Sequence, residues 1–308
     1  MPPTLPVVTG LARIESARAW LTELPSLIEQ VREAFDLRLS APLHGGSCSW
    51  VAPTELPDGT PAILKIGWPH REMYGEPIAL RQWDGRGAVR LLAHDPGRHA
   101  LLLERCVPGQ QLATAAGAAE ERLRVGATVL RRLTTAALPP AGDLEPLAVV
   151  TAEWADLLDE RMARLRPGFD PGLVAEGARL LRELPASADR EVLLHGDFNP
   201  GNILATAGRG WLAIDPKPMV GDPAYDPWPL LEQVDDPFAH PDPQRVLPDR
   251  VALLADELSL DSRRIVWWAL ARMVEWSLWA VAHGDVAGGA GGMRNARTLA
   301  DLSSRLGA

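Results

Sequence analysis

The chain has 308 residues, of which 46% are hydrophobic and 23% are charged. These values are ordinary for a globular protein, and the length is sufficient for two compact lobes. The formal net charge of −9 argues against nucleic acid as a partner, because nucleic-acid-binding proteins usually present a basic face.

The first third of the chain combines short apolar runs with turns and two helical stretches. In chain order, we predict a helix at 16–35, a turn into a strand at 43–51, a strand at 62–66, a helix at 73–83, and strands at 89–92 and 100–104. Residues 40–105 therefore predict a small lobe with a mostly antiparallel sheet and one helix.

The remainder of the chain is mainly helical in pattern. Helices are predicted at 114–138, 151–165, 172–184, 261–283 and 293–306, with strand and loop at 191–216 and an exposed Pro-Asp-rich loop at 235–249. The sequence thus favours an α+β protein with an N-terminal lobe at 1–105 and a C-terminal lobe at 106–308.

Cysteine content and hydropathy bear on the compartment. Cys48 and Cys106 are too few for a disulfide framework, so we expect a reducing, cytoplasmic setting. The first ten residues lack the basic and apolar parts of a signal peptide. The most apolar stretch, 265–282, contains Arg272 and Glu275, which would be costly in lipid. We therefore expect a buried helix there and no membrane partner.

Charge and lysine usage are both uneven. Residues 1–105 carry 11 basic and 12 acidic residues, whereas residues 106–308 carry 20 and 28, so nearly all the net acidity lies in the C-terminal part. Only two of the 31 basic residues are lysine, Lys65 and Lys217. Because a compact ammonium group and a planar guanidinium group are not interchangeable, these two lysines are better candidates for function than lysines usually are.

The most informative motif is an H-x-D sequence, His195-Gly196-Asp197, followed five residues later by Asn202. Two short apolar runs around a glycine-rich turn then predict a hairpin that ends at Asp215. Protein kinases have this order: a catalytic loop, a hairpin, and an aspartate that holds magnesium. The pattern predicts Asp197 as the base for a substrate hydroxyl, with Asn202 and Asp215 as oxygen ligands of Mg²⁺.

Lys65 lies upstream in a predicted strand, where protein kinases keep the lysine that contacts the phosphates of ATP. Its expected carboxylate partner is Glu76, eleven residues later, with Glu72 as the alternative. The chain has no G-x-x-x-x-G-K-[ST] and no G-x-G-x-x-G sequence, so a P-loop enzyme is excluded. The turn that covers the phosphates would then be the one containing Gly45, Gly46 and Ser47, through its backbone N–H groups.

The same residues resemble a known family. His195-Gly196-Asp197 with Asn202, the segment Ile214-Asp215-Pro216-Lys217-Pro218 and the segment Gly221-Asp222-Pro223 are similar to the aminoglycoside phosphotransferase family. Within it, residues 79–92 also resemble the streptomycin 6-kinase and hydroxyurea-resistance kinase branch. The resemblance covers about residues 40–280.

This resemblance implies a two-lobed protein-kinase-like fold with ATP in the cleft and Mg²⁺ on Asn202 and Asp215. It implies that Asp197 is the catalytic base, that Lys65 anchors the phosphates, and that the backbone from Leu103 to Cys106, including Glu104, contacts adenine. The role of Lys217 stays open between a phosphate contact, a carboxylate contact and a structural salt bridge.

For the acceptor, the resemblance implies a small cationic molecule such as streptomycin. A site that binds such a molecule needs carboxylates and aromatic faces. Besides Asp197, the candidates for contacting it are Asp235, Asp236, Glu275 and Trp276; the last two share a helix face with Trp268, Arg272 and Trp279. Core packing is the more common use of such a stripe.

The predicted function is a magnesium- and ATP-dependent O-phosphotransferase that acts on the 6-hydroxyl group of streptomycin, as a monomer. Kinases of hydroxyurea, a peptide antibiotic or a metabolite alcohol would use the same chemistry on a different acceptor. The sequence is also compatible with a non-catalytic nucleotide-binding regulator or a protein kinase. The regulator is disfavoured by the complete set Lys65, Asp197, Asn202 and Asp215, and the protein kinase by Gly196 in place of arginine.

Overall fold

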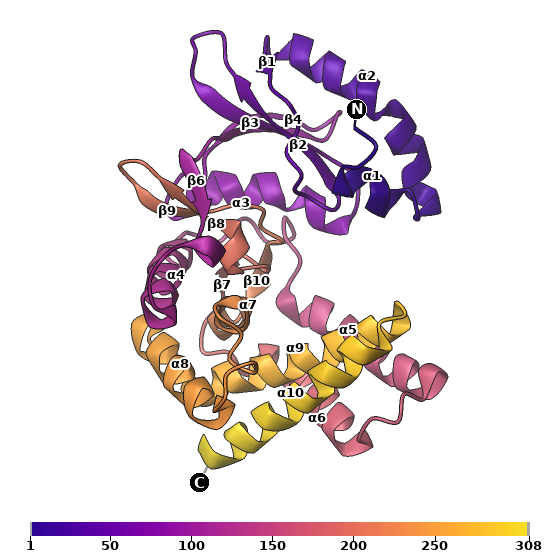
Figure 1. The fold of residues 1–308 in the computed structure, drawn as a ribbon, viewed down its shortest axis with the longest axis vertical. Coiled ribbons are helices and arrows are strands. Elements are labelled where there is room, and N and C mark those ends of the chain that lie inside the picture. Colours follow the sequence, from indigo (N-terminus) through magenta and orange to yellow (C-terminus); the bar gives the residue numbers. More distant parts are fainter. Residues whose placement is uncertain (1, 307–308) are drawn as a thin grey trace. The chain divides into compact units, whose positions relative to one another are not determined.

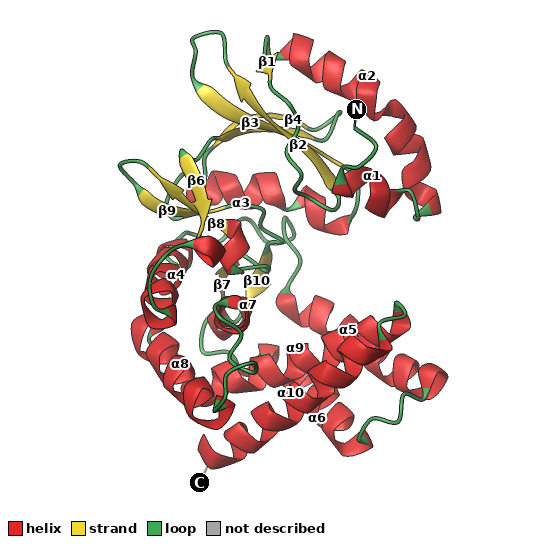
Figure 2. Ribbon diagram, in the orientation of Figure 1, coloured by secondary structure: helices red, strands yellow, loops and turns green. Residues whose placement is uncertain are grey.

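Residues 2–306 are described by the computed structural model. They divide into two compact units. The first runs up to Gly109 and takes in Ala205–Leu212, and the second comprises Gln110–Leu204 and the chain from Ala213 onward. Figure 1 labels the helices and strands, and Figure 2 colours them by type.

The first unit is built on a five-stranded sheet in which every neighbouring pair is antiparallel. The strands are β1 (Arg38–Leu39), β2 (Ser49–Glu55), β3 (Pro61–Gly67), β4 (Leu91–Asp95) and β5 (Ala100–Glu104), in the order β1-β2-β3-β5-β4. The helices are α1 (Pro6–Leu11), α2 (Arg18–Ala34) and α3 (Glu76–Trp83), with short 3-10 helices η1 (Glu15–Ala17) and η2 (Arg71–Tyr74).

The alternation of side chains along β3 organises this unit. Leu64 and Ile66 are fully buried in a core that also contains Leu24 and Val31 of α2. Because successive strand residues point to opposite faces, Lys65 lies on the other side of the sheet. That side is covered by α3, which supplies the carboxylate partner of Lys65. The sheet is thus packed on one face by the apolar side of α2 and on the other by α3, which carries Glu76.

The second unit is mainly helical, around a short two-stranded ladder. Its helices are α4 (Ala119–Leu133), α5 (Leu147–Leu165), α6 (Pro171–Glu183), α7 (Pro227–Gln233), α8 (Pro243–Leu258), α9 (Ser262–Ala282) and α10 (Val286–Leu306). The ladder pairs β7 (Val192–Leu194) antiparallel with β10 (Met219–Gly221). The 3-10 helices are η3 (Leu112–Thr114), η4 (Pro185–Ser187), η5 (Pro200–Asn202) and η6 (Pro223–Tyr225). A third sheet, β6 (Pro108–Gln111), β8 (Ile203–Thr206) and β9 (Gly210–Ala213), includes residues of both units.

Helix α9 is the central element of the second unit. It contacts α5, α6, α7, α8 and α10 (Figure 1). Its N-cap is Asp261, whose side chain accepts a hydrogen bond from the backbone N–H of Arg264 at 2.9 Å. Within residues 2–306, no helix is long and apolar enough to span a bilayer. The prediction of a buried helix over this apolar stretch is confirmed, since most of its apolar residues are inaccessible.

Most predicted elements are present, but the loop predicted at 235–249 is wrong. Helix α8 begins at Pro243 within that segment. Proline at the first turn of a helix loses no hydrogen bond, because the first N–H groups have no intrahelical acceptor. The side chain of Asp242 caps the helix by accepting from Arg245 N at 3.2 Å. The prolines that indicated a loop therefore include one that starts a helix. Helix α7 was also not predicted.

Candidate active site

In the first unit, Lys65 and Glu76 form a buried ion pair. The Nζ of Lys65 donates to Oε2 of Glu76 at 2.5 Å, and the two residues are 8% and 2% exposed. Glu72, the alternative partner, lies on η2 and is exposed. Burial makes it costly for either charge to lose the other. The pair therefore holds the ammonium group of Lys65 in one place.

The glycine turn of the first unit precedes β2. Gly46 has a φ of +83°, and a Cβ there would lie 2.8 Å from the carbonyl oxygen of Ser49, so the turn needs glycine. Gly45 and Ser47 are exposed. None of the three backbone N–H groups donates to an acceptor within residues 2–306. These donors are available to an anion.

The predicted hinge residues lie at the end of β5. Glu104 exchanges hydrogen bonds with the backbone of Arg90 and is ion-paired with Arg209, which also donates to the carbonyl oxygen of Gly85. Cys106 is buried, which raises the pKa of its thiol to about 11. The sequence did not indicate Arg209. Arg209 lies in the turn between β8 and β9. Through its contacts with Glu104 and Gly85, it ties this hairpin to the end of β5 and to the glycine-rich segment around Gly85.

In the second unit, the predicted catalytic loop is held by a buried carboxylate that the sequence did not indicate. Asp226 is inaccessible, and its two oxygens accept from the backbone N–H groups of His195 at 2.7 Å and Gly196 at 2.9 Å. Burial raises the pKa of Asp226 to about 6, against the effect of these two donors. Asp226 precedes α7, so this helix and the loop are fixed to each other.

His195 is a structural member of the loop. Its Nε2 lies 3.0 Å from the carbonyl oxygen of Ile214, and its Nδ1 accepts from Asp197 N at 3.3 Å. These contacts assign the proton to Nε2. Burial lowers the pKa of His195 to about 4, so the ring is neutral at physiological pH. The histidine thus connects the loop to the residue that precedes Asp215.

Asp197 carries three hydrogen bonds on its carboxylate. Asn199 Nδ2 donates to Oδ1 at 3.0 Å, while Asn202 Nδ2 and Lys217 Nζ donate to Oδ2 at 3.2 Å and 2.8 Å. The side chain is 30% exposed, so a hydroxyl group can reach it. The structure therefore brings together three residues of the H-G-D-x-x-x-x-N motif and the lysine of the D-P-K segment.

Asn202 and Asp215 lie at the two ends of the hairpin segment, and the carbonyl oxygen of Asn202 accepts from Ile214 N at 2.9 Å. Because Nδ2 of Asn202 points to Asp197, its Oδ1 points away from Asp197, and it accepts no hydrogen bond in the described chain. Asp215 has a left-handed φ of +55°. One amide and one carboxylate oxygen suit Mg²⁺ that is also held by phosphates. No three His, Cys, Asp or Glu side chains converge in residues 2–306.

The acidic acceptor candidates are mostly engaged. Asp235 is ion-paired with Arg122, and Glu275 with Arg161 at 2.7 Å. Asp236 is exposed and accepts from the backbone N–H of Phe238 at 2.9 Å. Each of these carboxylates therefore has a structural contact.

The tryptophans of α9 divide between core and surface. Trp268 is fully buried and donates to Asp222 at 2.6 Å, so it belongs to the core. Trp276 and Trp279 are each 44% exposed, and Trp279 stacks on His283. Core packing therefore accounts for part of the predicted stripe, and its C-terminal end presents aromatic surface.

A carboxylate that the sequence did not indicate is Glu232 on α7. Burial raises its pKa to about 7, and the charge of Arg272 opposes this rise. The side chain of Glu232 forms no hydrogen bond or ion pair in the described chain. Arg272 lies over the Tyr225 ring at 4.2 Å and donates to the Tyr225 carbonyl oxygen at 3.1 Å. Only tertiary packing distinguishes Glu232 from the other acidic residues.

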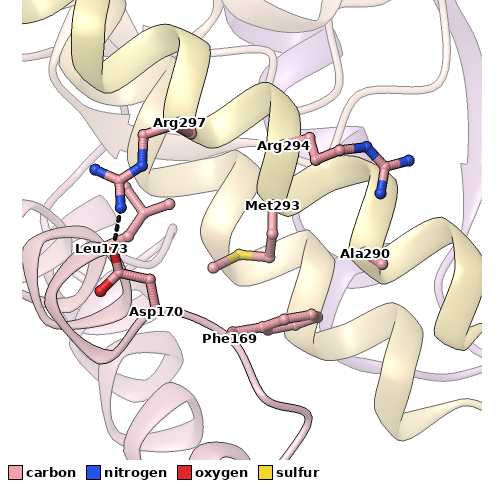
Figure 3. Close-up of a pocket in the computed structure, with 7 residues that line it drawn as sticks. All are labelled: Phe169, Asp170, Leu173, Ala290, Met293, Arg294 and Arg297. Carbon is pink, nitrogen blue, oxygen red and sulfur yellow. Dashed lines mark hydrogen bonds and ion pairs between the residues drawn. The ribbon is translucent and has the colours of Figure 1, made fainter.

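A surface pocket of the second unit lies apart from these residues. Figure 3 shows it between α10 and the start of α6, with Met293, Leu173 and Phe169 beside the ion pair of Asp170 and Arg297. It contains none of the predicted site residues.

Known proteins resemble this chain over most of its length. A family model described as aminoglycoside/hydroxyurea antibiotic resistance kinase matches residues 38–284. Streptomycin 6-kinase of Streptomyces glaucescens is 34% identical over 286 residues, 92% of each chain. Hydroxyurea phosphotransferase of Kitasatospora aureofaciens is 37% identical over 277 residues, 88% of this chain and 77% of that one. Choline kinase LicA from Streptococcus pneumoniae aligns with a TM-score of 0.63 at 16% identity, covering 91% of this chain and 99% of that chain. The predicted kinase-like fold is thereby confirmed.

Proposed function

Because this chain belongs to the aminoglycoside/hydroxyurea antibiotic resistance kinase family, we propose that it transfers the terminal phosphoryl group of ATP to the 6-hydroxyl group of streptomycin. The observation that carries the proposal is the half-exposed carboxylate of Asp197, held by Asn199, Asn202 and Lys217. The 34% identity to a streptomycin 6-kinase over 92% of the chain supports the acceptor.

Asp197 is the general base of the proposed reaction. The acceptor oxygen bonds to the γ-phosphorus while its proton passes to the Asp197 carboxylate. The bond from the γ-phosphorus to the bridging oxygen breaks, and the electron pair leaves with ADP. A positioned base of this kind contributes about 10²- to 10⁴-fold to the rate. The half-exposed position of Asp197, with its backbone held by His195, is consistent with this role.

In this proposal, the first unit supplies the contacts with ATP, the phosphoryl donor. The ammonium group of Lys65, fixed by Glu76, binds the α- and β-phosphates. The N–H groups of Gly45, Gly46 and Ser47 donate to phosphate oxygens, since they have no protein acceptor in the described chain. The backbone from Glu104 to Cys106 contacts the adenine ring.

Asn202 and Asp215 would hold Mg²⁺. The donor chemistry is appropriate, because both residues offer hard oxygen atoms and Asn202 uses only its amide nitrogen within the protein. When bound, Mg²⁺ neutralises charge on the phosphates. Asp197 is not counted among the ligands, because its carboxylate is directed to Asn199, Asn202 and Lys217.

A cationic acceptor agrees with the charges of the second unit. Glu232 is a half-buried carboxylate without an ion pair in the described chain. A guanidinium group of the acceptor would compensate its charge and return the hydrogen bonds lost on burial. Trp276 and Trp279 of α9 offer exposed aromatic faces that suit a cationic group.

Hydroxyurea is the second candidate acceptor, because hydroxyurea phosphotransferase of Kitasatospora aureofaciens is 37% identical over 88% of this chain. Hydroxyurea is neutral and small, so it would not compensate Glu232. A coupled assay of ADP release, with streptomycin, hydroxyurea and kanamycin as acceptors, decides between them. We expect turnover with streptomycin, and NMR of the product should place the phosphate on the 6-hydroxyl group. Turnover with hydroxyurea alone would disprove the proposed acceptor and leave phosphotransfer intact.

A further inference from the structure

Both lysines of the chain are bound to carboxylates. Lys65 pairs with Glu76 in the first unit, and Lys217 pairs with Asp197 in the second. The donor phosphates account for Lys65. Lys217 has no assigned role, although it contacts the base itself at 2.8 Å.

The hydrogen bonds on Asp197 distinguish its two oxygens. An ionised carboxylate has about four lone-pair positions, two on each oxygen. Oδ2 accepts from both Asn202 and Lys217, whereas Oδ1 accepts only from Asn199. The position that remains is therefore on Oδ1.

The backbone, and not only the ion pair, fixes Lys217 beside Asp197. Lys217 N donates to the carbonyl oxygen of His195 at 2.8 Å, next to the β7–β10 ladder. The Lys217 carbonyl lies against Gly196, where a Cβ would be 1.9 Å from its oxygen. The residues before and after Lys217 are prolines, which restrict the local backbone. The backbone of Lys217 is therefore fixed, and its side chain extends from this fixed point to Asp197.

We propose that Lys217 is a positioning residue for the base: together with Asn202 it occupies Oδ2 of Asp197, so that Oδ1 faces and deprotonates the acceptor hydroxyl. The inference rests on the proposed function. In the transfer step, the hydroxyl proton moves to Oδ1, the acceptor oxygen bonds to phosphorus, and ADP leaves with the electron pair of the broken bond. Lys217 keeps all three of its protons.

The exposure of the pair separates this role from a stabilising one. The side chains of Lys217 and Asp197 are 37% and 30% exposed. Exposed ion pairs contribute little to folding stability. Loss of Lys217 should therefore change turnover much more than stability.

The test is a double-mutant cycle of Lys217→Met and Asp197→Asn, measured by single-turnover phosphorylation of streptomycin. Lys217→Met alone should lower the rate of phosphoryl transfer by about 10²-fold, within the range for a general base. In the Asp197→Asn background it should cause less than a threefold further loss, because a residue that acts through Asp197 has no separate effect. Titration calorimetry should give the same affinity for ADP in wild type and Lys217→Met.

Arg182→Met is the matched control, because it removes a surface cation paired with Asp156 and Asp159 in the same unit. It should leave the rate unchanged. If Lys217→Met has a lower melting temperature than the wild type, Lys217→Ala replaces it in the same double-mutant cycle. Additive losses, or a tenfold weaker affinity for ADP in Lys217→Met, would overturn the inference and assign Lys217 to the donor phosphates.

A crystal structure with streptomycin and a non-hydrolysable ATP analogue tests the choice of oxygen. The acceptor hydroxyl should lie within hydrogen-bond distance of Oδ1 of Asp197, and a contact with Oδ2 instead would overturn the inference. Failure of the proposed function looks different, since the wild type would then not phosphorylate streptomycin. The cycle would in that case be measured on the slow hydrolysis of ATP, where water supplies the hydroxyl group, with the same outcomes deciding.

Discussion

The carbonyl oxygen of Lys217 lies so close to Gly196 that a Cβ on this glycine would be 1.9 Å from it. Gly196 also has a left-handed φ of +82°, which other residues rarely adopt. Protein kinases have arginine at the corresponding position of their H-R-D motif. In this chain, the glycine of the H-G-D motif and the lysine of the D-P-K segment therefore depend on each other.

Gly196→Ala should be strongly destabilising and should nearly abolish turnover. The left-handed backbone costs about 1–2 kcal/mol for an L residue, and the contact with Lys217 must be relieved by moving the loop. We expect at least about 3 kcal/mol lost in urea denaturation. Gly208→Ala is the control, because Gly208 has a φ of +74° but no atom within 4 Å of a built Cβ. Equal losses for the two variants would show that the contact with Lys217 does not matter.

Asp215→Asn and Asn202→Ala should change the response to magnesium. Each variant loses or weakens one proposed oxygen ligand, so the Mg²⁺ concentration for half-maximal rate should rise by about tenfold or more, the scale of perturbing a metal site. Asp197→Ala serves as the contrast, since it should lower kcat by at least about 10²-fold with little change in Mg²⁺ dependence. Unchanged Mg²⁺ titrations for both ligand variants would exclude this metal site.

Lys65→Arg should impair catalysis although it preserves the charge. The ammonium group is buried and lies 2.5 Å from Glu76, where a planar guanidinium group is bulkier and donates in a different geometry. We expect kcat/KM for ATP to fall by about tenfold or more, a cost of roughly 1.4 kcal/mol. Arg32→Lys, in an exposed pair with Glu29, is the neutral control. Full activity of Lys65→Arg would place the phosphate anchor elsewhere.

Acid should destabilise the protein through His195. Its pKa falls from 6.5 to about 4 on folding, because burial disfavours the charged ring. The unfolded chain therefore takes up a proton at His195 before the folded protein does. Stability is unaffected above pH 6.5 and is lost as pH falls toward 4. The loss over this window is roughly 3 kcal/mol.

Asp226 acts in the opposite direction, since its pKa rises from 3.8 to about 6 and its protonation favours the folded state. The two effects offset each other in the wild type. His195→Gln keeps a donor for Ile214 and removes only the histidine titration. Urea denaturation at several pH values should therefore show that the variant gains stability relative to wild type as pH falls. Parallel pH curves for the two proteins would contradict a neutral His195.

The sequence predicted residues whose function depends on spacing along the chain. Asp197, Asn202 and Asp215 were predicted because a kinase-type loop and the hairpin after it impose fixed spacings between them. Lys65 was identified by its position in a strand, and Glu76 by its position on the following helix. In both cases, the local element determines where the side chain lies.

Residues that act through tertiary contacts were not predicted. Asp226 supports the proposed catalytic loop from 30 residues away, and nothing in its sequence neighbours indicates that it accepts from two buried N–H groups. Helix α8 was not predicted, because the sequence around a proline that begins a helix looks the same as the sequence around a proline in a loop. The pairing of Asp235 and Glu275 with buried arginines likewise depends on helices distant in sequence.

The last prediction concerns the acceptor and rests on Glu232. Glu275 is already paired with Arg161 at 2.7 Å, whereas Glu232 has no such partner in the described chain. Glu232→Gln should therefore raise the KM for streptomycin by about tenfold, which corresponds to one charge-assisted hydrogen bond of roughly 1.4 kcal/mol, and leave the KM for ATP unchanged. Glu275→Gln, which breaks a half-buried ion pair, should act mainly on stability.

The pKa of Glu232 provides an independent check. Burial raises it to about 7, so the carboxylate becomes charged as pH rises through neutrality. The guanidinium groups of streptomycin stay charged over this range, so the KM for streptomycin should fall between pH 6 and pH 8 in the wild type and stay flat in Glu232→Gln. The wild-type KM should also rise with ionic strength more than the KM for ATP does. If Glu232→Gln retains the wild-type KM and its pH dependence, the cation is bound elsewhere, and Trp276 and Asp236 are the next residues to test separately.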